Sequence, residues 1–176
     1  ADLVGIRECC TLLRLLHQRG ERTILEASCI IEYVGLKLPG PVRLIPADPH
    51  VALEVRMMDR FFDNYVMTPM QRIVFDSLRP AEARDPHGVG EARAMLDTAY
   101  RWLDDTKSTP EWAAAGVFSR ADCAAAPALF YADWTHRIPE ALPVLRAYRA
   151  RLLARPSFAR AVEEARSFRS LFPLGA

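Results

Sequence analysis

The feature that most constrains the fold is the stretch of residues 118–134, which reads FSRADCAAAPALFYADW. Ser119 is followed three residues later by Asp122, and this spacing predicts a capping box with aspartate in place of the usual glutamate. In such a box the Ser119 hydroxyl accepts from the Asp122 amide, and the Asp122 carboxylate accepts from the Ser119 amide. Phe118 and Cys123 stand at the positions of a hydrophobic staple around this cap. We therefore expect a helix to begin at Ser119.

The segment that follows the cap is apolar on every side of the expected helix. Within residues 123–132 only Pro127 departs from this apolar character. A helix that is hydrophobic all round is buried, either in a protein core or in a membrane. A membrane span needs roughly 20 apolar residues, and this run is shorter. The sequence therefore predicts a helix buried at the centre of an all-helical domain.

Apolar residues recur at helical spacing in further segments on both sides of the buried helix. The first segment has Asp48 as its cap and Pro49 in its first turn, and Pro69 should kink or interrupt it. Two more segments follow Pro139 and the pair formed by Arg155 and Pro156. With the buried helix, we count five helices in the domain. The four additional segments are residues 49–79, 90–106, 140–152 and 156–165.

The N-terminal part of the chain has a different pattern. Residues 1–22 contain closely spaced leucines that predict a short amphipathic helix ended by Gly20. Residues 23–25 are predicted to form a strand, and residues 27–34 a helix. Residues 35–48 are rich in glycine and proline, which indicates a linker. We therefore place a domain boundary there, between residues 1–40 and residues 41–176.

Charge and cysteine usage limit the possible partners. The 23 basic and 22 acidic residues leave a formal charge of +1, which favours neither nucleic acid nor an anionic membrane surface. The chain has four cysteines without a CxxC pair, and two of them lie in apolar helical segments typical of buried, reduced thiols. We therefore expect a cytoplasmic protein. Cys9 and Cys10 with His17 do not have the spacing of a metal site, so we predict no metal.

Two stretches resemble one known family. Ser119, Ala121, Asp122 and the apolar run after them resemble the buried central helix of the C-terminal domain of cytosolic glutathione transferases. Residues 25–34, LEASCIIEYV, resemble the last strand and helix of that family's thioredoxin-like domain. The aligned positions in this second stretch are Glu26, Ile30, Glu32 and Tyr33. The resemblance implies a mainly α fold: residues 41–176 form a glutathione transferase C-terminal-like helical bundle, and residues 1–40 form a truncated thioredoxin-like α/β remnant.

The resemblance also implies a function. In its intact form such a protein conjugates the co-substrate glutathione to a small electrophile. Relatives place an acidic residue and then a serine at the start of the helix that binds the γ-glutamyl carboxylate. Here Glu26 is followed by Ala27, and Ser28 offers a hydroxyl one position later, about 100° further around the helix. Glu26, Ala27 and Ser28 are therefore the predicted glutathione-binding residues, although without the resemblance they would be interpreted as an ordinary helix start.

The resemblance extends to the substrate pocket and the quaternary structure. The first helix of this domain also lines the electrophile pocket in relatives, which makes Phe61, Tyr65 and Arg72 candidate pocket residues. An aromatic stripe of this kind belongs more often to a protein core than to a ligand site. The resemblance further implies a homodimer formed through residues 49–79 and 90–106.

The residue that stabilises the glutathione thiolate is not assigned. In relatives it is a tyrosine, serine or cysteine near the first strand of the thioredoxin-like domain. Only 24 residues precede Leu25, and residues 1–22 have neither the expected tyrosine or serine nor a valine–proline pair. We therefore expect that the catalytic stretch is missing and that the start is truncated, frame-disturbed or replaced. The alternative function is a non-catalytic helical interaction module or an inactive truncated copy.

Overall fold

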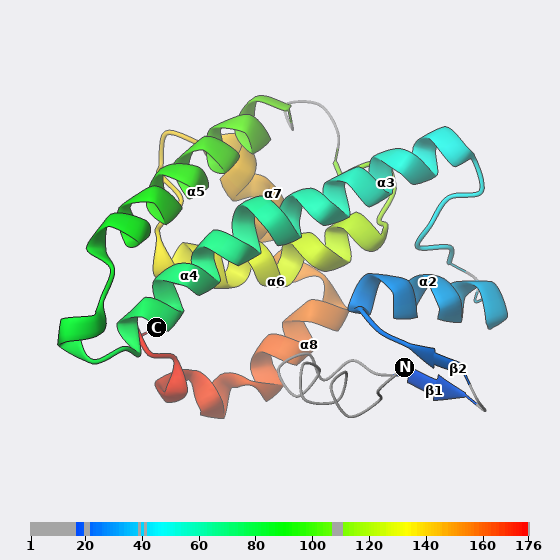
Figure 1. Cartoon of the computed structure of the whole chain (residues 1–176). Helices are drawn as coiled ribbons and strands as arrows, with labels where there is room; N and C mark the ends of the chain where they lie inside the picture. Colours follow the sequence, from blue (N-terminus) through cyan, green and yellow to red (C-terminus); the bar gives the residue numbers. More distant parts are fainter. Residues whose placement is uncertain (1–16, 20–21, 39, 41, 107–110, 176) are drawn as a thin grey trace.

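The computed structural model of the chain describes residues 17–19, 22–38, 40, 42–106 and 111–175 (Figure 1). A small N-terminal part lies beside a larger group of helices. It consists of β1 (His17–Arg19), β2 (Arg22–Ile24) and α2 (Ala27–Lys37). The helical part consists of α3 (Pro49–Phe61), the π-helical segment η1 (Phe62–Met67), α4 (Thr68–Ser77), the short 3₁₀ helix η2 (Ala81–Ala83), α5 (Pro86–Thr106), α6 (Arg120–Thr135), α7 (Pro143–Ala154), α8 (Pro156–Glu164) and the 3₁₀ segment η3 (Arg166–Leu171).

The N-terminal part confirms one expectation and corrects another. The predicted strand and helix are present as β2 and α2, with the strand one residue earlier and the helix extended to Lys37. The helix predicted within residues 1–22 is wrong at His17–Arg19, which form β1 and pair antiparallel with β2. The backbone groups of β1 are hydrogen-bonded to β2, a separate segment. The spacing of apolar residues within one segment does not predict such pairing. The leucines of that predicted helix lie outside the described residues.

Pro69 changes the helix that contains it, as predicted, but by widening it. Proline has no N–H, and its ring clashes with the carbonyl of the residue four positions earlier. The chain accommodates this through the π-helical turn of η1, so that α3, η1 and α4 follow one another without a break. The Thr68 amide donates to the Asp63 carbonyl, and the Thr68 hydroxyl donates to the same oxygen at 2.8 Å. The interruption therefore lies just before the proline and keeps the backbone hydrogen-bonded.

Helix α6 lies at the centre of the core, which confirms the predicted buried helix. It packs against α3, η1 and α7, and Figure 1 shows it running alongside α3 and α4. Its inward side is made mostly of alanines, and small side chains let neighbouring helices approach closely. The α6 residues with no exposed surface are Ala121, Asp122, Ala125, Ala128, Leu129 and Ala132. Large fully buried rings from other elements, among them Phe62 and Tyr100, fill the remaining space.

The capping box at the start of α6 is formed as predicted. The Ser119 amide donates to Asp122 Oδ2 at 2.9 Å, and the Ser119 hydroxyl lies 3.2 Å from the same oxygen. The other carboxylate oxygen accepts from the Ala113 amide and the Tyr148 hydroxyl, both at 2.8 Å. Burial, strengthened by the Asp122 charge, raises the pKa of Tyr148 far above its ordinary value. Asp122 thus joins the preceding loop, α6 and α7 through hydrogen bonds from neutral donors.

Phe118, the residue before the cap, packs edge-to-face on Trp112, with ring centroids 5.3 Å apart. The Arg155 guanidinium lies over the Phe118 ring, with its central carbon 3.4 Å from the ring centroid. These contacts fix the entry of the chain into α6, while the staple contact with Cys123 stays a prediction. The remaining helices follow the predicted order, with α5 beginning at Pro86 rather than at residue 90.

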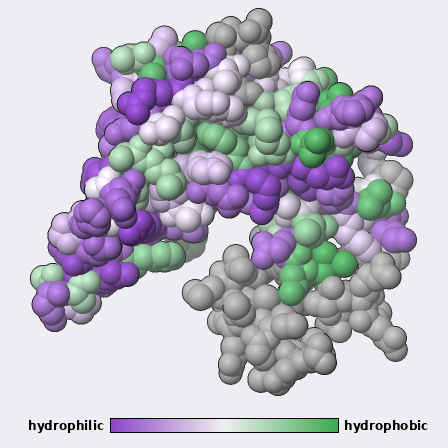
Figure 2. All heavy atoms as spheres, turned by 45° about the horizontal axis from the view of Figure 1, so that its top comes forward, coloured by the Kyte–Doolittle hydropathy of each residue, from purple (hydrophilic) through white to green (hydrophobic). Residues whose placement is uncertain are grey.

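The surface is mixed in character. On the face drawn in Figure 2, green hydrophobic patches are separated by bands of purple hydrophilic side chains. Several exposed large hydrophobic side chains belong to α3, η1, α4 and α5. Among the described residues, none of the helices combines the length and the apolar character that crossing a membrane would require.

Candidate functional site

The start of α2 has an unusual backbone. Glu26 precedes the helix with φ 68° and ψ 128°, in a region that residues other than glycine rarely adopt. Such strain costs roughly 1–3 kcal/mol and is concentrated at functional sites. No side chain of the described residues caps the helix, whereas the Ile30 amide is bonded to the Glu26 carbonyl at 2.9 Å. The earlier amides of the first turn therefore provide the positive end of the helix dipole, which favours an anion.

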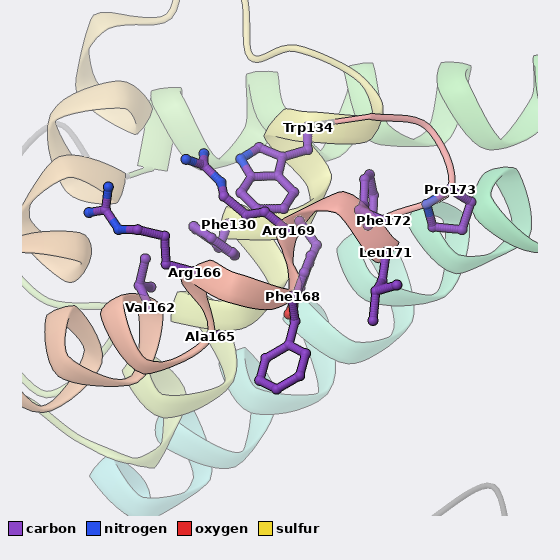
Figure 3. Close-up of a pocket in the computed structure, with 11 residues that line it drawn as sticks. Phe130, Trp134, Val162, Ala165, Arg166, Phe168, Arg169, Leu171, Phe172 and Pro173 are labelled. Carbon is purple, nitrogen blue, oxygen red and sulfur yellow. The ribbon is translucent and has the colours of Figure 1, made fainter.

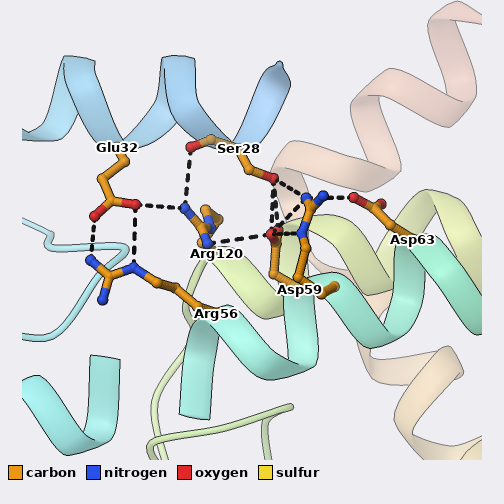
Figure 4. A network of polar contacts seen from close by, with 7 residues as sticks. Ser28, Glu32, Arg56, Asp59, Asp63 and Arg120 are labelled. Carbon is orange, nitrogen blue, oxygen red and sulfur yellow. Dashed lines mark hydrogen bonds and ion pairs between the residues drawn. The ribbon is translucent and has the colours of Figure 1, made fainter. Parts of the chain in front are cut away.

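An ionic cluster holds α2 against α3, η1 and α6 (Figure 4). We call it the α2 cluster, and its members are Ser28, Glu32, Arg56, Asp59, Arg60, Asp63 and Arg120. It contains three carboxylates and three guanidinium groups, so its formal charges balance. Because the cluster is neutral as a whole, it does not cancel the preference of the helix start for an anion.

Arg120, the first residue of α6, is the centre of the α2 cluster. Its side chain is only 5% exposed, and its Nη1 donates to the Ser28 carbonyl at 3.2 Å and to Glu32 Oε2 at 3.0 Å. Its Nη2 lies 3.3 Å from Asp59 Oδ2, and the Asp59 side chain is 4% exposed. One buried guanidinium therefore joins the first turns of α2 to α3 and α6.

Ser28 points into the α2 cluster. Its hydroxyl donates to Asp59 Oδ2 at 2.9 Å and accepts from Arg60 Nη2 at 2.7 Å. The hydroxyl predicted to bind glutathione is thus engaged between two side chains of α3. Glu26 and Ala27 are exposed, so the structure leaves the carboxylate and the helix start accessible while Ser28 fastens the helix.

Protonation in the α2 cluster follows from these contacts. The hydrogen bond from Arg56, and then the positive charges of Arg56 and Arg120, hold the pKa of Glu32 below its ordinary value. Burial raises the pKa of Asp63, and the adjacent Arg60 opposes this rise. The same hydrogen bond, which Arg56 donates to Glu32, in turn raises the pKa of Arg56. The Arg56–Glu32 pair therefore stays charged over the whole neutral range.

The sequence analysis did not assign the α3 members of the cluster. Arg56, Asp59 and Arg60 of α3 and Asp63 of η1 follow the spacing i, i+3, i+4, i+7, which places them on one side of the continuous helix. That spacing was the available signal, but a charged stripe on a helix usually faces solvent. Arg120 gave a second signal, because it is a charged residue at the start of an otherwise apolar helix.

The predicted electrophile-pocket residues lie in three successive elements, Phe61 at the end of α3, Tyr65 in η1 and Arg72 in α4. Phe61 is two residues from Asp59, about 200° around the helix, and its ring centroid lies 4.4 Å from that of Trp102 in α5. The Tyr65 ring is 5.3 Å from that of Phe61, so these two residues are together. Arg72 is apart from them, and its Nη2 lies 3.2 Å from Glu91 Oε2.

The cysteines differ from expectation at one position. Cys29 lies in an apolar helical segment but is exposed in the first turn of α2, because this helix buries none of its residues and meets α3 and α6 through the polar contacts of Ser28 and Glu32. Cys123 is half-buried, and burial raises the pKa of its thiol. Cys9 and Cys10 lie outside the described residues, whereas His17 belongs to β1. In the described ranges, no group of three or more His, Cys, Asp or Glu side chains is arranged to hold a metal ion.

Comparison with known proteins agrees with this architecture. The family profile of the glutathione S-transferase C-terminal domain matches residues 66–156, which is more than half of the chain. The central α6 with its cap, the helices around it and the attached β–α unit define a protein of the glutathione transferase class. The chain belongs to the glutathione S-transferase family. No curated protein sequence matches it.

Solved structures share the fold. A glutathione S-transferase from Methylobacterium radiotolerans JCM 2831 in complex with glutathione sulfonate has a TM-score of 0.73 and 22% identity, over 92% of this chain and 78% of that chain. One from Methylobacillus flagellatus KT with glutathione bound has a TM-score of 0.71 and 22% identity, over 79% and 69%. Gtt2 from Saccharomyces cerevisiae has a TM-score of 0.71 and 20% identity, over 82% and 73%. At these identities the likeness concerns the fold alone.

Proposed function

We propose that the start of α2 binds the γ-glutamyl end of glutathione and that the intact protein conjugates glutathione to an electrophile. The strained Glu26 at an uncapped helix start carries this proposal. Family membership supports it, as do the related structures with glutathione or glutathione sulfonate bound. A cytoplasmic location, predicted from the cysteine usage, belongs to the same proposal.

The chemistry of the γ-glutamyl group suits this position. The group carries one carboxylate and one ammonium. The amides of the first turn donate to the carboxylate at the positive end of the helix dipole. The exposed Glu26 carboxylate accepts from the ammonium. Ser28 and Arg120 act as positioning residues, because they fasten the helix that carries these groups.

The described residues provide only part of the affinity. An exposed contact at a helix end contributes about 0.3–1 kcal/mol, whereas even a millimolar Kd requires about 4.1 kcal/mol. Lowering the pKa of the glutathione thiol from near 8.5 needs a donor or a positive field at the sulfur. Among the described residues we assign no such donor. We therefore expect this chain to bind glutathione with a millimolar or weaker Kd and not to activate it.

An amide NMR titration of the 176-residue chain tests the glutathione site, because the method detects weak binding. We expect glutathione to shift the amides of Ala27, Ser28 and Cys29, with saturation in the millimolar range. Cysteinylglycine, which lacks the γ-glutamyl group, serves as the matched control ligand and should leave these amides unchanged. Equal shifts with both ligands, or glutathione shifts that Glu26→Gln does not weaken, would contradict the proposal.

A partner surface belongs to the same proposal, because the family resemblance implies a homodimer. Large apolar side chains are exposed on α3, η1, α4 and α5. These are Leu53, Met57, Tyr65, Phe75, Met95 and Trp102. Where such side chains form a contiguous apolar patch, that patch marks an interaction surface. Sedimentation equilibrium at micromolar concentration should give a dimer, and a monomer would contradict this part of the proposal.

Two roles compete for Phe61 and Tyr65, since the electrophile pocket remains a proposal for them and for Arg72. A pocket role predicts that Tyr65→Ala changes the KM for an electrophile in the intact enzyme at unchanged dimer affinity. A partner role predicts that Tyr65→Ala weakens the dimer at unchanged KM. The alternative of a non-catalytic interaction module is favoured if the dimer forms and glutathione causes no shift at α2.

A further inference from the structure

The end of α6 contributes to two cavities of different character. One, of about 290 Å³, lies between the second half of α6, α8 and η3, and we call it the aromatic cavity because rings form most of its walls (Figure 3). The other, of about 230 Å³, lies between the end of α6, the segment that follows it and α7, and charged side chains form most of its walls. Adjacent residues of α6 line different cavities, Trp134 the aromatic one and Asp133 the charged one.

We call the charged cavity the arginine cavity, because three guanidinium groups line it. Its lining includes Asp133, Arg137, Ile138, Glu140, Arg146 and Arg149. Ligand sites in proteins typically measure about 300–1,000 Å³, so this cavity suits a small ligand. The buried Ile138 side chain gives it an apolar wall. A short carbon chain can therefore lie beside the charged groups.

Asp133 and Arg149 form the fixed part of the arginine cavity. Arg149 Nη2 lies 3.1 Å from Asp133 Oδ2, and Arg149 Nε donates to the Leu129 carbonyl at 3.2 Å. The other oxygen of Asp133 accepts from the Ile138 amide at 2.9 Å. The two charged side chains are only 20% and 19% exposed. The Asp133 carboxylate is therefore engaged by Arg149 and the backbone, and it does not pair with the other two arginines.

The remaining charges leave the arginine cavity positive. Arg146 Nη1 lies 3.6 Å from Glu140 Oε1, but the Glu140 side chain is 94% exposed, and such a pair contributes little. Among the described residues, Arg137 forms no ion pair. Burial lowers the pKa of Arg149, the charge of Asp133 opposes this, and the positive charges of Arg137 and Arg146 add to it. The three guanidinium groups thus lie close enough to repel one another, and an anion between them relieves that repulsion.

The C-terminal part of the chain has the same sign of charge. Residues 137–176 contain eight arginines and three acidic residues, although the whole chain has a formal charge of only +1. A local excess of one charge raises the local concentration of ions of the opposite charge. The near-neutral composition therefore conceals a basic region that attracts small anions.

The arrangement of the arginines favours a phosphate group over a carboxylate. A carboxylate has two oxygens in one plane, and a single guanidinium can occupy both of them. A phosphomonoester presents three acceptor oxygens and carries a charge of roughly −1.5 to −2 at neutral pH. Arg146 and Arg149 are neighbours on one face of α7, and Arg137 comes from the segment before that helix. One phosphate group can therefore accept from more than one of these guanidinium groups.

We propose that the arginine cavity binds a phosphate group, supplied by inorganic phosphate or by a small phosphomonoester, with Arg137 and Arg146 as its main partners. The site is distinct from the start of α2. Asp133 follows Arg120 of the α2 cluster by thirteen positions in α6, which corresponds to about 20 Å along the helix. The inference therefore does not depend on glutathione binding.

Calorimetric titration of the 176-residue chain with glycerol 3-phosphate and with glycerol tests the phosphate requirement. Only the first ligand carries phosphate, so we expect only the first to bind. Inorganic phosphate distinguishes the two sources: tighter binding of the ester identifies a phosphomonoester, and equal binding identifies the free ion. Acetate tests the preference over a carboxylate. It should bind at least about tenfold more weakly than either phosphate, because one guanidinium satisfies it.

Substitutions of the two exposed arginines test the assigned partners. Arg137→Gln and Arg146→Gln should each weaken glycerol 3-phosphate at least about fivefold, the loss of one charge-assisted contact. Arg146→Lys keeps the charge without the planar fork, so it should recover only part of that loss. Arg160→Gln is the matched control, because Arg160 is exposed, pairs with Glu164 and does not line this cavity. Far-UV circular dichroism confirms that each variant is folded.

Amide NMR locates the site. Glycerol 3-phosphate should shift the amides of residues 136–142 and of α7, with and without saturating glutathione. Absence of binding at millimolar concentration, or equal binding of glycerol or acetate, would overturn the proposal. Shifts confined to α2, or equal losses in Arg160→Gln and Arg146→Gln, would overturn it as well.

Discussion

Two polar groups lie at the start of α6, and they are built in opposite ways. Asp122 is fully buried and is surrounded by neutral donors from the chain around it. Two positions earlier, Arg120 reaches across to α2 and stands among charged groups that balance one another. The first arrangement stabilises the helical domain from within. The second joins that domain to the β–α unit that carries the candidate glutathione site.

The difference predicts how each group responds to change. Hydrogen bonds from neutral donors to one buried carboxylate depend little on salt, because no long-range charge pair is involved. A cluster of balanced charges at a partly exposed boundary is sensitive to any change in one member, since the remaining charges are left unpaired. We therefore expect variants of Asp122 to unfold the whole domain and variants of the α2 cluster to loosen α2 selectively.

The largest effect is expected for Asp122→Ala. The substitution removes the buried acceptor that the amides of Ala113 and Ser119 and the Tyr148 hydroxyl share. One hydrogen bond to a charged group contributes about 1.5–3 kcal/mol, and losing a buried network is among the largest effects of single substitutions, so the free energy of unfolding should fall by about 3–5 kcal/mol. Urea denaturation measures this, with Glu140→Gln as the exposed control. A loss below 1 kcal/mol would mean that Asp122 is not the centre of the fold.

Arg120→Met should have the next largest effect, with a loss of about 2–3 kcal/mol, because it removes the buried one of the two guanidinium partners of the buried Asp59 carboxylate and leaves only the half-exposed Arg60. Hydrogen exchange should accelerate in α2 more than in α6. The double variant with Asp59→Leu removes both charges and should recover part of the loss. If α6 exchanges as fast as α2, the two groups at the start of α6 act as one, and the comparison fails.

Ser119→Ala tests the capping box, which belongs to the first of the two polar groups. It removes the side chain of a capping box at a dry helix start, and the expected loss is about 1 kcal/mol, up to about 2 kcal/mol. Chemical denaturation measures this loss of stability. Ser157→Ala, a substitution at an exposed position of α8, serves as the control. Unchanged stability would contradict the role of the hydroxyl in starting α6.

The smallest effect is expected for Glu32→Gln, and it depends on pH. The folded-state pKa of Glu32 lies below the ordinary value of 4.5, so its stabilisation is present above that pH and is lost as the pH falls through the folded-state pKa. Because the pair with Arg56 is partly exposed, the loss at neutral pH should stay below about 1 kcal/mol. Denaturation series should converge for the parent and the variant at low pH. A difference that grows on acidification would contradict the assigned pKa direction.

The start and the burial of α6 could be predicted from sequence because both are local properties. The capping pair is three residues apart, and the apolar run belongs to one segment, so short-range spacing carries the whole signal. The disturbance of the helix at Pro69 could be predicted for the same reason, because proline acts on the helix that contains it. The form of that disturbance, a π-helical turn hydrogen-bonded through Thr68, depended on how the helix packs on α6.

The candidate sites depended on contacts between distant segments. Arg120 meets the Ser28 carbonyl across 92 positions, and Ser28 meets Asp59 across 31. The charged stripe on α3 is visible in the sequence, but only the packing of α2 on it decides that Asp59 is buried rather than solvated. The aromatic cavity likewise exists because η3 folds back on α6. The sequence by itself determined the helices and the family. Only the tertiary structure decided which charges and rings meet, because those contacts join distant segments and the local spacing of residues does not predict them.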